Sequence, residues 1–193
     1  RKDEYGGSLN NRMRFMDQVM NEVTKAAGNH TAVLVKMNMS DGFKGGMEKD
    51  ECLQVARRLV DDGAQALILS GGFVSKAPMY VMRGAMPIHS MTYYMKSLWL
   101  KYGVRLAGHL MIPTVPFREA YFLEDALDFR KAIREIPLVY VGGLVSRQKI
   151  EEVLGHGFEF VQMGRALLNE PGFVNRMKAE EQARCNCGHS NYC

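Results

Sequence analysis

The sequence contains few cysteines and no long apolar run. Four cysteines in 193 residues are too few for a disulfide scaffold, and Cys52 falls on a predicted helix face, so we expect a reducing compartment. No window holds about 18 uninterrupted apolar residues, and no signal peptide opens the chain. These absences exclude a membrane-spanning helix and predict a cytoplasmic protein with no membrane partner.

A strong charge of one sign is also absent. The chain has 25 lysines and arginines against 21 aspartates and glutamates, a net charge of +4. The basic residues are scattered rather than clustered, so a nucleic-acid partner is not expected. The apolar content of 47% is enough to bury a core within one domain.

Both ends suggest that this sequence is a fragment of a longer protein. The first residue is Arg1 rather than methionine, and the last is Cys193, which lies inside a cysteine-rich cluster.

Apolar periodicity predicts helices that alternate with buried strands. The near-continuous apolar strands call for a parallel sheet covered by helices, and four strands are too few to close a barrel. We therefore predict an α/β fold that forms the second half of a (β/α)8 TIM barrel. The predicted helices span 8–28, 50–59, 118–134 and 146–154, with a last one starting at 169, and the predicted strands span 32–37, 66–69, 138–141 and 160–163.

A long insertion at 73–117 follows the second strand. Within it, a helical stripe is predicted between Ser90 and Gly103. The stripe could pack over the barrel mouth, pack against a second subunit, or lie on a membrane surface. Its apolar members are Met91, Tyr94, Met95, Leu98, Trp99 and Tyr102.

Two strands end in glycine just before a predicted helix. Tyr140 and Val141 lead into Gly142 and Gly143, and the strand that begins at Phe160 leads into Gly164. Backbone N–H groups at such turns can converge on a phosphate, because a glycine has no side chain to hold the anion away. The last two strands of many (β/α)8 barrels form a phosphate site of this kind.

The segment from Arg1 to Phe15 (RKDEYGGSLNNRMRF) resembles the region after the fourth barrel strand in the old yellow enzyme family of FMN-dependent NAD(P)H oxidoreductases, which includes dienoyl-CoA reductase-like enzymes. The resemblance continues through Val35-Lys36, Gly142-Gly143, Met163-Gly164-Arg165 and Asn169-Glu170-Pro171. It implies the C-terminal half of an FMN-binding TIM barrel over 1–193, with an insertion or lid at 73–117 and a cysteine-rich tail at 183–193. The implied cofactors are FMN and NAD(P)H, and the implied substrate is a small enone or enoyl compound.

The resemblance also implies roles for single residues. Gly142, Gly143 and Gly164 would offer backbone contacts to the FMN phosphate, and Arg165 would lie beside the phosphate or the flavin ring. Lys36 stands where the family usually has arginine, beside the pyrimidine edge of the flavin, and a lysine in a buried strand needs a polar partner. The family's catalytic residues lie before the region that matches Arg1, so the catalytic residues are expected in an N-terminal half and stay unassigned. Residues 70–72 are weaker candidates for lining the flavin or the substrate.

Alternatives remain open. Lys36 could form a Schiff base in a lyase acting on a phosphorylated aldehyde, or the chain could be a non-catalytic half-barrel assembly unit. Cys185, Cys187 and Cys193 are weak metal candidates, because their C-x-C-x5-C spacing departs from the C-x2-C-x3-C pattern of family members with a four-iron cluster. An iron–sulfur cluster is therefore doubtful, and an unliganded, disordered tail is expected. The unpaired edges and exposed strand faces of half a barrel predict a homo-oligomer.

Overall fold

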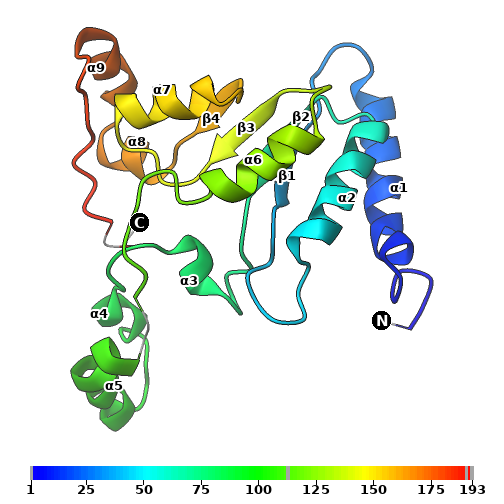
Figure 1. The fold of residues 1–193 in the computed structure, drawn as a ribbon. Coiled ribbons are helices and arrows are strands. Elements are labelled where there is room, and N and C mark those ends of the chain that lie inside the picture. Colours follow the sequence, from blue (N-terminus) through cyan, green and yellow to red (C-terminus); the bar gives the residue numbers. More distant parts are fainter. Residues whose placement is uncertain (1, 112–113, 190, 192–193) are drawn as a thin grey trace.

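The computed structural model describes residues 2–111, 114–189 and 191, and its centre is a four-stranded parallel sheet (Figure 1). The strand order is β1-β2-β3-β4, so each strand pairs with the next one along the chain. The strands are β1 (Leu34–Asn38), β2 (Ala66–Ser70), β3 (Leu138–Val141) and β4 (Phe160–Gln162). The predicted half-barrel of four parallel strands with covering helices is confirmed.

Helices cover one face of this sheet. Helices α2, α6 and α7 pack on the strands, and α1 lies beside α2 (Figure 1). On that face Leu67, Leu69, Leu138 and Tyr140 are fully buried. The bounds are α1 (Leu9–Ala27), α2 (Lys49–Asp61), α6 (Leu123–Ala132), α7 (Arg147–Gly155), α8 (Arg165–Asn169) and α9 (Phe173–Ala179).

The opposite face of the sheet, the open face, is exposed at its two edges, whereas Val139 near its middle is buried. Register aligns Lys36, Ile68, Val139 and Phe160 across the four strands, and aligned residues of parallel strands point to the same side. Leu34 and Phe160, at the two edges, are 51% and 57% exposed. This is the face that lines the interior of a closed barrel.

The prediction that Lys36 lies in a buried strand is wrong for this chain, because its side chain is exposed on the open face of edge strand β1.

Several predicted helix ends are confirmed by their caps. The Ser8 hydroxyl accepts from the Asn11 N–H at 3.3 Å, and Gly28 ends α1 with a φ of 53°. The Ser146 hydroxyl accepts from the Lys149 N–H at 3.3 Å at the start of α7. Side chains that satisfy the first free N–H groups fix where a helix begins.

Other predicted bounds need correction. The helix predicted at 118–134 begins only at Leu123, because Ala120 has a φ of 53°, which a helix cannot accommodate. The closing helix α9 begins at Phe173 rather than at residue 169, and the helix expected directly after Gly164 is the short α8.

Among its described residues, the long segment between β2 and α6 contains three helices, α3 (Pro78–Val81), α4 (Ile88–Met91) and α5 (Leu98–Met111). The single stripe predicted between residues 90 and 103 is therefore divided between two helices. Thr92 closes α4 by bonding back to the carbonyl of Ile88 at 2.8 Å, and the Ser97 hydroxyl accepts from the Leu100 N–H at 3.4 Å as α5 begins. In the described part of the chain, no helix is both long and apolar enough to cross a membrane.

Candidate functional site

The two glycine turns after β3 and β4 line one pocket. Its volume is about 250 Å³, and Gly142, Gly143, Gly164 and Arg165 all contribute to its wall. The pocket lies at the carboxyl ends of β2, β3 and β4, where Ser70 ends the neighbouring strand. Four of the five predicted cofactor-binding residues therefore line the same pocket. Ser70, one of the weaker candidates at 70–72, lines it as well.

Backbone geometry at the first turn depends on glycine. Gly143 has a φ of 67°, and a Cβ there would lie 2.6 Å from Tyr121 Cε1 and 2.8 Å from Phe117 Cε2. Both aromatic rings line the same pocket. A residue other than glycine would be strained by its φ and would displace the rings.

The second turn leaves free space instead. A Cβ added at Gly164 would meet no protein atom within 4 Å, and the φ of this residue is −109°. Within the described residues, the N–H groups of Gly143, Leu144 and Gly164 donate to no protein acceptor. Free N–H groups around an open pocket are typical of an anion site, so these turns fit the phosphate of FMN.

Tyr140 braces the first turn from inside the core. Its hydroxyl donates to the carbonyl of Gly142 at 3.1 Å and accepts from the N–H of Phe122 at 3.2 Å. The side chain is fully buried, and burial raises the pKa of the phenol, so it stays protonated and can donate. The carbonyl of Gly142 is thereby held in the protein interior.

We expect Tyr140→Phe to destabilise the chain by about 1–2 kcal/mol, because the Phe122 N–H and the Gly142 carbonyl both lose a buried partner. Urea denaturation would measure the change. Tyr93→Phe, at a side chain that is 65% exposed, is the matched control and should unfold with the parent. An unchanged midpoint for Tyr140→Phe would contradict the bracing role.

Residues from the long segment and the C-terminal segment close the pocket. The ring of His189 stacks on Phe117 with centroids 3.4 Å apart. Arg165 donates to Asn191 Oδ1 at 2.7 Å and to the carbonyl of Arg83 at 3.3 Å. Burial, followed by the positive charge of Arg165, lowers the pKa of His189, which favours a neutral ring.

Lys36 is the predicted cofactor residue that the structure leaves apart. It does not line the glycine-turn pocket and lies two strands away from β3, on the open face.

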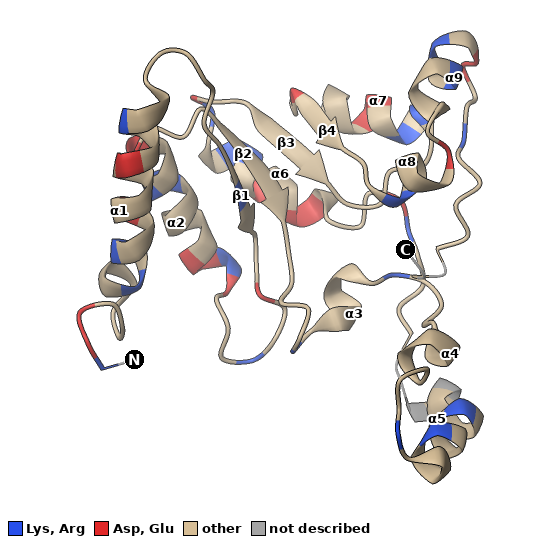
Figure 2. Ribbon diagram, turned by 180° about the vertical axis from the view of Figure 1, so that it is seen from behind, with Lys and Arg blue, Asp and Glu red and all other residues tan. Residues whose placement is uncertain are grey.

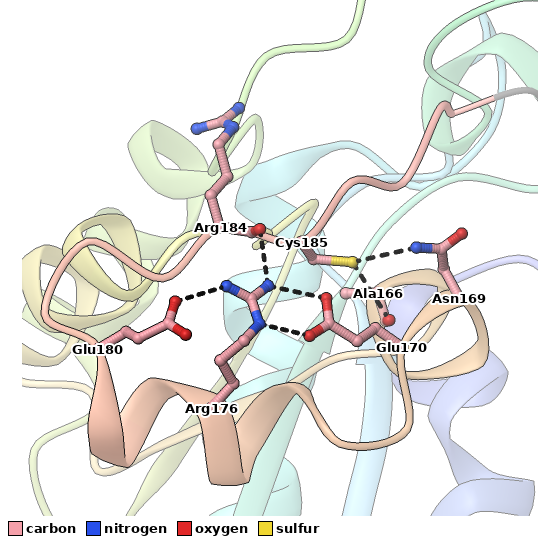
Figure 3. Close-up of polar contacts among 7 residues, drawn as sticks. All are labelled: Ala166, Asn169, Glu170, Arg176, Glu180, Arg184 and Cys185. Atoms are coloured by element: carbon pink, nitrogen blue, oxygen red, sulfur yellow. Dashed lines mark hydrogen bonds and ion pairs between the residues drawn. The ribbon is translucent and has the colours of Figure 1, made fainter.

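The prediction of a disordered tail is wrong for residues 183–189, where Ala183 and Cys185 are buried against the rest of the chain. Cys185 donates its N–H to Val145 O at 2.7 Å and forms side-chain contacts with Asn169 and Ala166 (Figure 3). Arg176 binds both carboxylate oxygens of Glu170, at 2.6 and 2.9 Å, and also the carbonyl of Arg184 (Figure 3). The hydrogen bonds from Arg176 lower the pKa of Glu170 and keep this carboxylate charged.

The described cysteines form no metal site. Cys185 is buried and packed as above, Cys187 is half-buried, and Cys193 lies outside the described residues. Among the residues that can be described, no group of histidine, cysteine and acidic side chains has a metal-binding arrangement. Burial raises the pKa of the Cys52 thiol to about 11, so this cysteine is a core residue rather than a nucleophile.

Charged residues of the segment from Arg1 to Phe15 form ion pairs that stabilise the fold. Arg14 pairs with Glu4 at 3.3 Å, whereas Arg12 forms a bidentate contact with Glu51 on α2. This segment thus helps to fix α1 against α2.

Comparison with known proteins identifies the family. The model of the NADH:flavin oxidoreductase / NADH oxidase family matches residues 1–107. The 4,4'-dithiodibutanoate disulfide reductase of Rhodococcus erythropolis is 40% identical over 194 residues, a match that covers 100% of this chain and 48% of the relative. The NADH oxidase of Thermoanaerobacter brockii is 23% identical and is covered over 25% of its length.

Solved structures share the fold. A 2-naphthoyl-CoA reductase aligns with a TM-score of 0.72 at 17% identity, over 97% of this chain and 24% of its own. Morphinone reductase aligns with a TM-score of 0.55 at 16% identity, over 100% of this chain and 44% of its own. The chain thus spans about half or less of the length of these proteins, and the predicted FMN and NAD(P)H are the cofactors of the matched family. The chain belongs to the NADH:flavin oxidoreductase / NADH oxidase family, as its resemblance to the old yellow enzymes predicts.

Proposed function

We propose that this chain is the phosphate-binding half of an FMN-dependent oxidoreductase barrel. The observation that carries the proposal is the pair of glycine turns, which place the free N–H groups of Gly143, Leu144 and Gly164 around one pocket beside Arg165. The pocket volume of about 250 Å³ suits a phosphate but not a whole flavin nucleotide. The isoalloxazine ring would therefore extend over the open face of the sheet.

Each residue has a distinct part in this proposal. The turn N–H groups bind the phosphate, and Arg165, held by Asn191, adds positive charge at its side. Lys36 on the open face supplies a cation near the ring. Bound FMN would supply hydride transfer from NAD(P)H to an electron-poor double bond of a small enone or enoyl substrate. The remaining ring contacts and the catalytic groups would come from a segment that completes the barrel.

The function is tested by completing the barrel. The chain would be co-expressed with the part of the Rhodococcus erythropolis disulfide reductase that it does not match, which is 52% of that relative because the match covers 48%. We expect a yellow complex whose visible band is bleached by NADH or NADPH without oxygen. A colourless complex that has formed would contradict the proposal.

In such a complex, Lys36→Met should slow flavin reduction by NAD(P)H and lower the reduction potential of the flavin, because the anionic reduced ring loses a nearby cation. Stopped-flow absorbance and a redox titration would measure the two effects. Lys44→Met, an exposed lysine in the loop after β1, is the control. Borohydride trapping of a substrate on Lys36 would instead support a Schiff-base lyase.

We also propose that the isolated chain forms homo-oligomers. Strands β1 and β4 are sheet edges, and Leu34 and Phe160 lie exposed on them. Exposed edges and apolar strand faces favour association. Light scattering should show a mass above 21.8 kDa that falls on dilution, and a monomer at every concentration would contradict this.

A further inference from the structure

The hairpin of α4 and α5 extends away from the sheet and turns an apolar face outward. Both views show α5 beside α4 and far from the strands (Figures 1 and 2). Trp99, Leu106 and Leu110 are 91%, 87% and 91% exposed, and Tyr102 is 64% exposed. Their spacing of three to seven residues places them along one side of the helix. The amphipathic helix of a globular protein normally turns this side inward.

The inner side of α5 packs on α4. A Cβ on Gly108 would lie 3.1 Å from the Ile88 side chain, so the two helices are in close contact there. Arg105 donates to Thr92 Oγ1 at 3.0 Å, and Lys101 donates to the carbonyl of Tyr93 at 3.2 Å. These bonds hold two cations at the flank of α5 and leave its apolar side uncovered by α4.

Charge in this region has one sign. No aspartate or glutamate occurs from residue 63 to residue 118, whereas six of the 25 lysines and arginines lie there. Figure 2 shows blue on α5 and no red on α3, α4 or α5. All 21 acidic residues lie elsewhere, so the rest of the chain carries more acidic than basic groups. The six cations are Lys76, Arg83, Lys96, Lys101, Arg105 and Arg118.

We propose that the α4–α5 hairpin binds the surface of an anionic lipid bilayer, with α5 lying in the plane of the membrane. A helix of 14 residues is about 21 Å long, too short to span the bilayer but long enough to embed an apolar side at the interface. Exposed tryptophan and tyrosine suit the headgroup level, and flanking lysine and arginine suit anionic lipid.

Charge also argues against a second copy as the occupant of this face. Two hairpins brought face to face would each carry the same excess of cations, with no acidic group in the segment to pair with them. An anionic bilayer supplies the opposite charge and an apolar layer together. The proposal thus departs from the expectation of no membrane partner, which rests on the absence of a spanning helix.

Trp99 provides a direct probe, because it is the only tryptophan of the chain. With vesicles of equal parts phosphatidylglycerol and phosphatidylcholine, we expect its emission to shift to shorter wavelength and the protein to float with the lipid. Pure phosphatidylcholine vesicles should give neither effect, and raised salt should weaken binding. No shift and no flotation with the anionic vesicles would overturn the proposal.

Two double variants separate the apolar and the charge contributions. Leu106→Ser with Leu110→Ser keeps the probe and should lower partitioning about tenfold or more. Val19→Ser with Val23→Ser on α1 has the same four-residue spacing, and these valines are 43% and 42% exposed, so this control should bind as the parent does. Lys96→Glu with Lys101→Glu should lower partitioning by at least about fivefold per residue, and Lys25→Glu with Lys178→Glu, of equal net charge, should have little effect.

Other outcomes decide whether a bilayer or a second copy of the chain covers the apolar side of α5. Vesicle binding that both test variants leave unchanged would overturn the proposal, since it would locate the contact elsewhere. Failure to bind vesicles, together with an oligomer that Leu106→Ser with Leu110→Ser dissociates, would overturn it in favour of a second copy. None of the substituted residues lines the glycine-turn pocket, so the outcome of these experiments is independent of the proposed oxidoreductase function.

Discussion

Replacing Glu119 by alanine is expected to destabilise the chain by about 2–4 kcal/mol, because one carboxylate serves three donors. It accepts from the Val145 N–H at 2.9 Å, from the Ser146 hydroxyl at 3.1 Å and from Arg184 at 2.7 Å. The glutamate side chain is only 11% exposed, and Val145 and Ser146 are buried. Without the carboxylate, the loop after the first glycine turn loses its side-chain link to Arg184 in the C-terminal segment and keeps the backbone bond from Cys185 to Val145.

Urea denaturation followed by circular dichroism would measure this loss. Glu22→Ala on α1, at an exposed glutamate, is the matched control and should change stability little. Glu119→Gln retains one acceptor oxygen and should fall between the two. Equal midpoints for Glu119→Ala and Glu22→Ala would show that Glu119 does not connect these segments.

Replacing Gly164 by valine should lower the affinity for FMN about tenfold or more, through loss of close approach between the backbone and the phosphate. This substitution should affect ligand binding rather than folding, because the φ of Gly164 is −109° and no protein atom lies within 4 Å of an added Cβ. Gly143 would be a poorer choice, since its φ of 67° and its contacts with Tyr121 would strain the protein itself.

Gly155→Val is the control for that experiment. Gly155 ends α7, lies outside the pocket, and would likewise place its Cβ in open space. Flavin fluorescence quenching gives the affinity of each variant. The same FMN affinity in Gly164→Val and Gly155→Val would remove Gly164 from the phosphate site.

The strands and the glycine turns could be predicted because their signals are local. The strand at 138–141 is a run of four apolar residues between Pro137 and Gly142, and the observed strand has the same bounds. Ser8 and Ser146 begin helices through bonds to N–H groups three residues away. The parallel order then brings the ends of β3 and β4 together.

The contacts that close the site could not be predicted, because they join residues far apart in the sequence. Arg165 meets Arg83 and Asn191, which lie 82 and 26 residues away, and Glu119 meets Arg184 across 65 residues. The hydrogen bonds of Tyr140 could have been predicted in part, because a tyrosine inside an apolar strand is buried and its hydroxyl then needs a hydrogen-bond partner. The prediction of one helix between residues 90 and 103 was wrong because the apolar pattern continues through the turn at 92–97. Hydrogen bonds of the Thr92 and Ser97 side chains end α4 and begin α5 there.

The central claim, that the two glycine turns hold the phosphate of a flavin nucleotide, is tested most directly by titrating the parent chain with FMN and with riboflavin. The two ligands share the ring and differ in the phosphate. We expect FMN to bind weakly, because the pocket holds only the phosphate end, but at least about tenfold more tightly than riboflavin, as expected for charge-assisted hydrogen bonds to the turns. Equal affinities for FMN and riboflavin, or binding of neither, would contradict the account.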